Sequence, residues 1–168
     1  MEQELEFLKK RRSIRRYKTE QIGEQQLHDL EEMATLAASA MNEQAWFFVV
    51  IQKPEILQEL AELSGRSDPF YSAPTLIVAF ARTEAIASVV DTAFAMSNMM
   101  NAAVADGLGT CFINAMKEVF NDSRHSELKT ACGVPDGFEC IGSLAVGYPD
   151  EAPAVPTNRK WDVFSYIR

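Results

Sequence analysis

The segment from Val89 to Asp106 carries apolar side chains around almost its whole circumference when it is read as a helix. These side chains belong to Ala93, Phe94, Ala95, Met96, Met99, Met100, Ala102, Ala103 and Val104. A helix that is apolar nearly all round has to be buried nearly all round. A chain of 168 residues can hardly enclose such a helix alone. Burial against a second copy of the chain is therefore the economical solution, and a central helix of a monomer is the alternative.

The other elements follow from apolar runs and from the signals at their ends. Continuous apolar runs at residues 46–51 and 75–81 predict strands buried on both faces. A short strand is expected at 110–113, and the last strand is expected at 138–148. Helices are expected at 2–10, 23–41, 54–63 and 123–132, and Gly107 is expected to cap the apolar helix in a left-handed conformation. These spacings do not repeat as βαβ units, so we predict one α+β domain spanning residues 1–168.

The charge and the cysteines narrow the class of protein. A net charge of −8 disfavours a general nucleic-acid binder, whereas the basic patch from Lys9 to Arg16 suits a small anion. Three cysteines without CxxC spacing, and two histidines without a metal-binding pattern, argue against a zinc site or a disulfide framework. A reducing cytoplasmic location is expected, with no membrane-spanning segment and no signal peptide.

Three segments carry candidate binding residues. Arg11 to Tyr17 offers several guanidinium groups and a hydroxyl, which suit phosphate oxygens, although a solvated basic helix end explains them equally well. Ser39 to Trp46 offers amide groups for the edge of a heteroaromatic ring, although a polar turn is the better reading of these residues alone. Gly107 to Asn114 places glycines before a strand, where backbone can approach a ligand closely; the alternative is a capped helix and a short turn.

Together and in this order, the three segments resemble the nitroreductase family. Arg-Arg-Ser-Ile-Arg-Arg-Tyr at 11–17 is similar to the family's RRSxRxY/F, and residues 39–50 resemble its SxxNxQPWxFxVV. Residues 106–113 resemble its GLGTxxI, residues 141–149 its closing strand, and Arg159 its C-terminal arginine. The resemblance spans essentially the whole chain and identifies it as a short member of the family.

The resemblance implies a central, mostly antiparallel mixed sheet flanked by helices, in an intertwined homodimer with two FMN sites at the subunit interface. It assigns the FMN phosphate to Arg11, Arg12 and Ser13, helped by Arg159, and the flavin pyrimidine to Arg15. Ser39, Asn42 and Gln44 would reach the same flavin from the other subunit or line its edge. The backbone N–H groups around Asn114 and Ala115 would face the flavin N5. The tail at about 151–168 is expected to pack on the partner.

The implied activity is an NAD(P)H oxidoreductase that transfers hydride through FMN to a small acceptor, such as a nitroaromatic or a quinone. No catalytic side chain and no metal are required, because the cofactor carries the chemistry. A flavin-binding redox sensor or flavin store with little turnover is the alternative. The chain departs from the family's pattern at Ala45 and at Asn114-Ala115, and it is too short after residue 81 for a helical lid. We therefore expect an open active site.

Overall fold

The computed structural model describes residues 8–153 and 159–168, and its centre is a four-stranded antiparallel sheet in the order β1-β2-β4-β3. The strands are β1 (Trp46–Ile51), β2 (Thr75–Arg82), β3 (Gly109–Ile113) and β4 (Phe138–Gly147). A single parallel bridge between Ser13 and Thr110 extends the β3 edge. The predicted α+β class is confirmed, with a fully antiparallel sheet and one parallel bridge.

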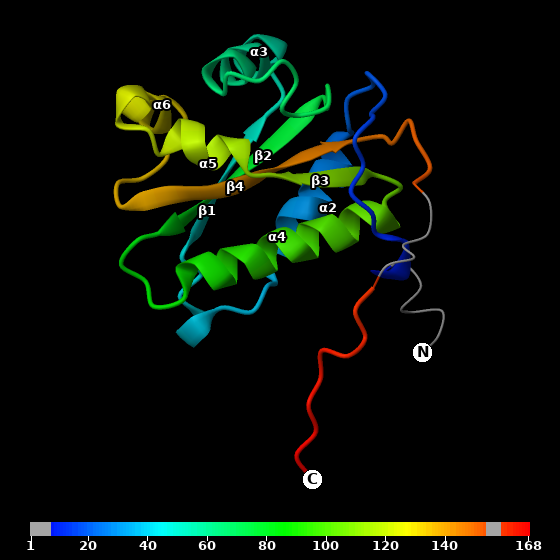
Figure 1. Ribbon diagram of the computed structural model, residues 1–168. Helices are drawn as coiled ribbons and strands as arrows, with labels where there is room; N and C mark the ends of the chain where they lie inside the picture. The colour runs from blue at the N-terminus through cyan, green and yellow to red at the C-terminus, as the bar shows by residue number, and fades with distance from the viewer. Residues whose placement is uncertain (1–7, 154–158) are drawn as a thin grey trace.

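Helices cover both faces of this sheet (Figure 1). On one face lie α2 (Glu24–Thr35) and α4 (Ser88–Ala105); on the other lie α3 (Pro54–Leu63), α5 (Ala115–Phe120) and α6 (Ser126–Ala131). Short 3-10 helices, η1 (Ala40–Asn42) and η2 (Ser123–His125), occupy two of the connections. Each layer has its own core, and alternate β2 side chains divide between them: Leu76, Val78 and Phe80 face α3 and α5, whereas Ile77 and Ala79 face α2 and α4.

Strand β4 changes this alternation halfway along. Its register against β2 passes from Ala79 opposite Gly142 to Phe80 opposite Cys140, so Ile141 is the extra residue of a β-bulge. Cys140 before the bulge and Ala145 after it both face the α3–α5 core, although they differ in parity. Gly142, with φ +147°, leaves room for the Phe112 ring, because a Cβ there would lie 2.5 Å from the Phe112 Cζ.

The apolar helix α4 is covered on only one side by its own chain. Ala95, Met96, Met99 and Ala103 are buried on the sheet, but on the other side Val89, Val90 and Phe94 remain 50–58% exposed. One chain therefore does not enclose α4, and the alternative of a central monomer helix is wrong. The expected end of α4 is confirmed, because Gly107 has φ +73° and the Leu108 N–H donates to the Ala103 carbonyl at 2.7 Å.

Several boundaries differ from the sequence prediction. The helix expected to reach Met41 ends at Thr35, because the Ala40 N–H donates instead to the buried Asp91 carboxylate of α4 at 3.0 Å. Strand β1 was expected to be buried on both faces, but it forms an edge of the sheet and only Ile51 is fully buried. The six-residue helix α5 was not predicted. Most of the helix expected at 2–10 lies outside the described residues, and residues 8–10 are helical.

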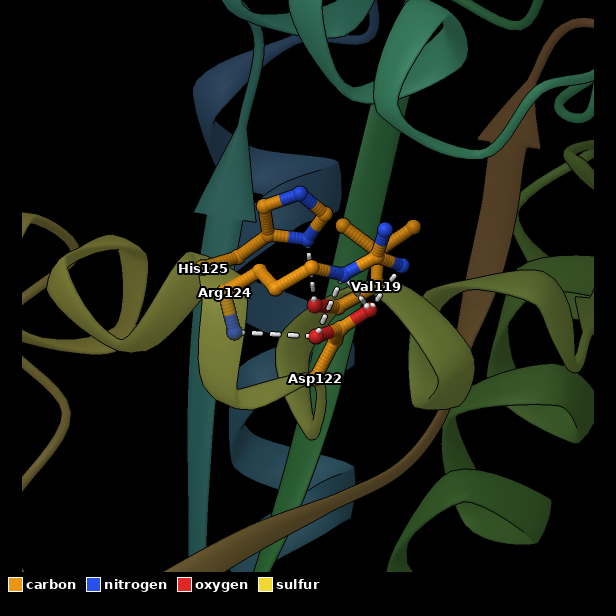
Figure 2. A network of polar contacts seen from close by, with 4 residues as sticks. All are labelled: Val119, Asp122, Arg124 and His125. Atoms are coloured by element: carbon orange, nitrogen blue, oxygen red, sulfur yellow. Dashed lines mark hydrogen bonds and ion pairs between the residues drawn. The ribbon is translucent and has the colours of Figure 1, made fainter.

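The single helix expected at 123–132 is divided into η2 and α6, and Asp122 rather than Ser123 caps it. The Asp122 carboxylate accepts the Arg124 backbone N–H at 2.9 Å and also binds the Arg124 guanidinium, as Figure 2 shows. These contacts lower the pKa of Asp122 to about 2. His125 Nδ1 lies 3.2 Å from the Val119 carbonyl oxygen. This network closes a turn. It explains the position of His125, one of the two histidines, without assigning it a catalytic role.

The docking of the N-terminal segment on β3 depends on Gly109. A Cβ at this position would lie 2.6 Å from Ile14 Cγ1 and 2.9 Å from Ile14 Cβ. We expect Gly109→Ala to lower the free energy of unfolding by about 1–3 kcal/mol, as overpacked sites do. Urea denaturation measures this loss. Ile14→Ala should also destabilise the protein. The double variant should lose less free energy of unfolding than the sum of the losses in the two single variants. Additive losses would contradict the contact.

Candidate functional site

The predicted arginine segment is extended and lies along the β3 edge of the sheet. The Ile14 N–H donates to the Thr110 carbonyl at 2.9 Å, and the Lys18 N–H donates to the Tyr148 carbonyl at 2.9 Å. The Ile14 and Tyr17 side chains are buried, and the Tyr17 hydroxyl donates back to the Ile14 carbonyl at 2.7 Å. Residues 11–17 are therefore not the solvated helix end that the sequence left open, and pairing with the sheet fixes their backbone.

Three of the predicted phosphate and pyrimidine ligands, Arg11, Ser13 and Arg15, alternate along the extended segment and form the arginine row. Burial raises the pKa of the Cys111 thiol, whereas the charges of Arg15 and Arg11 and a hydrogen bond with Ser13 act in the opposite direction. These influences indicate that the arginine row lies near Cys111.

Arg15 is held at two points. Its backbone N–H donates to the Glu151 carboxylate, and its guanidinium carbon lies 5.9 Å from the centroid of the Tyr71 ring. A hydrogen bond to Tyr71 raises the pKa of the guanidinium above its usual value, with smaller contributions from Cys111 and Glu151. Arg15 is exposed to solvent and stays fully charged at any pH the protein would meet.

Beside Arg15, Tyr71 also lines a cleft of about 360 Å³. One wall is formed by residues 66–69 and Tyr71 of the loop before β2, and the other by residues 112–115 at the end of β3. Asn114 and Ala115, the predicted neighbours of the flavin N5, belong to this second wall, where Asn114 is exposed and Ala115 is buried. The structure thus brings the arginine row and the β3–α5 junction to one side of the molecule.

The three polar residues predicted from the second segment also lie together, but elsewhere. The Ser39 Oγ accepts the Gln44 backbone N–H at 3.2 Å, and Gln44 Nε2 donates to Asn42 Oδ1 at 3.1 Å. Asn42 and Gln44 have positive φ values of 56° and 47°, as does Met41 at 53°. These left-handed residues turn the chain sharply into β1, and the amide groups remain exposed at the surface.

The two groups flank opposite edges of the sheet. Ser39, Asn42 and Gln44 precede β1, whereas the arginine row lies on β3, and β2 and β4 separate these strands. Three interstrand spacings amount to about 14 Å. Arg159 is exposed at the start of residues 159–168, which run away from the body of the domain (Figure 1). One chain therefore does not unite all ten predicted ligands.

Sequence reasoning missed three residues at this site. Tyr71 sits in a loop whose composition indicates only a turn, and Glu151 belongs to the expected tail. Phe112 was read as part of a strand, yet its ring is 47% exposed and borders the cleft. The glycines before β3 were expected to admit a ligand, but Gly109 admits the Ile14 side chain. No local sequence signal marks these long-range contacts.

Other kinds of site find little support in the described part of the chain. Residues 8–153 and 159–168 contain no group of three histidine, cysteine, aspartate or glutamate side chains placed to hold a metal ion. Within the same ranges, no helix combines the length and the hydropathy needed to cross a membrane.

Known structures share this fold over nearly their full length. A nitroreductase with bound FMN from Bacteroides fragilis matches with a TM-score of 0.88 and 27% identity, covering 98% of each chain. A nitroreductase with bound FMN from Desulfitobacterium hafniense matches with a TM-score of 0.87 and 26% identity, covering 100% of each chain. The fold is thus the one on which these two FMN-containing proteins are built.

Sequence comparison gives the same class. A protein of Archaeoglobus fulgidus, provisionally named NADH dehydrogenase/NAD(P)H nitroreductase, is 29% identical over 156 residues, which cover 90% of this chain and 88% of the relative. The sequence model of the nitroreductase family matches residues 8–67 and 62–148. The chain belongs to the nitroreductase family, and the resemblance seen in the sequence is confirmed.

Tyr17 makes the docked segment sensitive to alkaline pH. Burial raises the pKa of its phenol above the usual 10.0. The unfolded chain therefore loses this proton at a lower pH than the folded chain, so the stabilisation is complete below pH 10 and declines as the pH rises above it. We expect urea denaturation between pH 8 and 11 to show a steeper alkaline loss in the wild type than in Tyr17→Phe. Parallel losses would contradict this role for Tyr17.

Proposed function

We propose that this protein is an FMN-dependent NAD(P)H oxidoreductase that reduces a small acceptor such as a quinone or a nitroaromatic. The observation that carries the proposal is the arginine segment docked on β3, with Arg15 against Tyr71 at the cleft beyond the end of that strand. Solved proteins with this fold contain FMN, and relatives carry NAD(P)H nitroreductase names. The neighbouring side chains also suit this cofactor chemically.

The donor set fits a flavin mononucleotide. Guanidinium forks and the Ser13 hydroxyl match the oxygens of a phosphate dianion. The aromatic rings of Tyr71 and Phe112 offer flat apolar walls for a ring system, and the backbone at Asn114 and Ala115 lies on the same cleft. Arg11, Arg12 and Ser13 would hold the phosphate with help from Arg159, and Arg15 would lie at the pyrimidine.

FMN, when bound, would supply the hydride and electron chemistry. The chain would contribute binding, orientation and electrostatics. Arg15 would place a permanent positive charge where negative charge develops on reduction, and this charge stabilises the reduced form. The cleft is open at its mouth and no side chain in it need act as an acid or a base. Reductant and acceptor would therefore occupy the same space in turn.

The complete site would need two chains. Ser39, Asn42 and Gln44 lie across the sheet from the arginine row, so a second copy would bring its own set to the flavin. Two apolar surfaces suit such an assembly: the outer side of α4 and the edge strand β1. The tail adds Trp161, Phe164 and Ile167, which are 73–100% exposed. A tail with this much exposed apolar area would be covered by the partner subunit.

The visible spectrum tests the proposed activity. We expect the purified protein to be yellow, or to become yellow with added FMN, and to bleach when NADH or NADPH is added anaerobically. Oxidation of NAD(P)H should then proceed steadily once a quinone or a nitroaromatic is supplied. A bound flavin that both nucleotides leave oxidised would favour the alternative of a redox sensor or flavin store. A protein that takes up no FMN would refute the proposal.

An acidic residue on the outer side of α4 tests the two-chain site. Phe94→Glu should raise the dimer dissociation constant at least tenfold, because a charge would be buried in an apolar interface. It should weaken FMN binding in parallel, while circular dichroism stays native. Leu63→Glu, on α3 across the sheet, is the matched control and should leave both values near those of the wild type. Sedimentation and FMN titration measure the two effects, and FMN binding that survives in a Phe94→Glu monomer would contradict the shared site.

A further inference from the structure

The loop that carries Tyr71 has an unusual and well-supported backbone. Tyr71 and Ser72 have φ values of 56° and 54°, so two consecutive residues with side chains adopt the left-handed conformation. Asp68 fixes this turn, because its carboxylate accepts the Ser72 N–H at 2.8 Å and the Ser72 hydroxyl at 2.9 Å. Pro69 and Phe70 are buried, and Phe70 anchors the loop to the α3–α5 core. A disfavoured conformation held this firmly points to a constraint on where the loop places its side chains.

The side chain that this turn places is Tyr71. Its ring lies next to the Arg15 guanidinium, with 5.9 Å between the guanidinium carbon and the ring centroid. The same ring lines the cleft shared with Phe112 and Asn114. Tyr71 thus connects the arginine row on β3 to the space that the proposed cofactor ring would occupy.

Arg15 needs this support because the rest of its side chain lies in solvent. Its backbone is fixed by the hydrogen bond to Glu151 and by the pairing of Ile14 with Thr110. Its long side chain is exposed, and an exposed arginine otherwise samples many rotamers. The Tyr71 ring, which lines the cleft, favours an orientation in which the charge lies beside the cleft.

We infer that Tyr71 is a positioning residue that holds the Arg15 guanidinium at the mouth of the cleft for contact with the bound flavin ring. This inference rests on the proposed function and extends it to a residue outside the arginine segment. Tyr71 acts through Arg15. Its removal would leave the charge in place but let it move, which weakens flavin binding and reduces the preference for the reduced, more negative flavin.

The test compares Tyr71→Leu and Tyr71→Phe in the full-length protein. Leucine removes the ring and the hydroxyl, whereas phenylalanine keeps the ring. FMN titration of the flavin-free protein should show a two- to fivefold higher Kd for Tyr71→Leu, in line with an exposed cation–π contact. Tyr71→Phe should fall between this variant and the wild type. The midpoint potential of the bound flavin should become more negative in the same order.

An Arg15→Ala background separates positioning from simple packing. In that background Tyr71→Leu should change the Kd and the potential no further, because the residue through which Tyr71 acts is absent. Tyr148→Phe is the matched control, since it removes a tyrosine hydroxyl that binds Gln26, away from the cleft. It should leave the Kd and the potential unchanged. Equal effects of Tyr71→Leu with and without Arg15 would overturn the inference.

A readout without flavin completes the design. The readout is the ¹H–¹⁵N NMR signal of the Arg15 Nε–Hε group, identified by its loss in Arg15→Lys. In the flavin-free protein, the Tyr71 ring should displace the chemical shift of this signal. It should move to the position of an exposed arginine in Tyr71→Leu. A signal that does not move would overturn the inference and leave the proposed function standing. A wild-type protein that binds no FMN would instead end the proposed function, together with the flavin role given to Tyr71.

Discussion

The site depends on the close contact between the N-terminal segment and β3. Ile14 can lie directly against the strand because Gly109 has no side chain. The pairing with Thr110 then fixes the segment as an extended strand-like chain, and its arginine row influences the nearby Cys111 thiol. Arg16 and Asp150 add a second connection further along, where the Asp150 N–H donates to the Arg16 carbonyl at 2.9 Å. The charges of this site are therefore placed by backbone pairing and by one missing methyl group.

A second constraint is that one chain leaves much apolar surface exposed. The helix α4 is covered only on its sheet side, β1 pairs on only one edge among the described residues, and the tail presents several aromatic rings to solvent. These surfaces belong to three separate parts of the sequence, and large apolar patches of this kind commonly mark interaction sites. A symmetric dimer would cover them together, and it would supply the polar residues that the single chain keeps on the far side of its sheet.

The sequence predicted elements with strong local signals and missed those set by distant contacts. Long apolar runs located β2 and α4, and Gly107 marked the end of α4. The residue types at these positions themselves favour burial or a left-handed backbone conformation. The ends of α2 and α6 were misplaced, since a hydrogen bond to Asp91 and a cap by Asp122 decided them. At the site, the arginine motif indicated the right segment. Its extended conformation and its partner Tyr71 depend on contacts between residues far apart in the chain.

The bulge in β4 has a consequence for how this strand can change. Before Ile141 the even-numbered residues of β4 face the α3–α5 core, whereas after Gly142 the odd-numbered residues face it. Deleting Ile141 would leave Cys140 opposite Phe80 and Gly142 opposite Ala79, so both halves of the strand would keep their layers. A one-residue insertion or deletion elsewhere in β4 would instead slip the pairing and turn part of the strand towards the wrong layer. The bulge is consequently the place where this strand can lose a residue without inverting its faces.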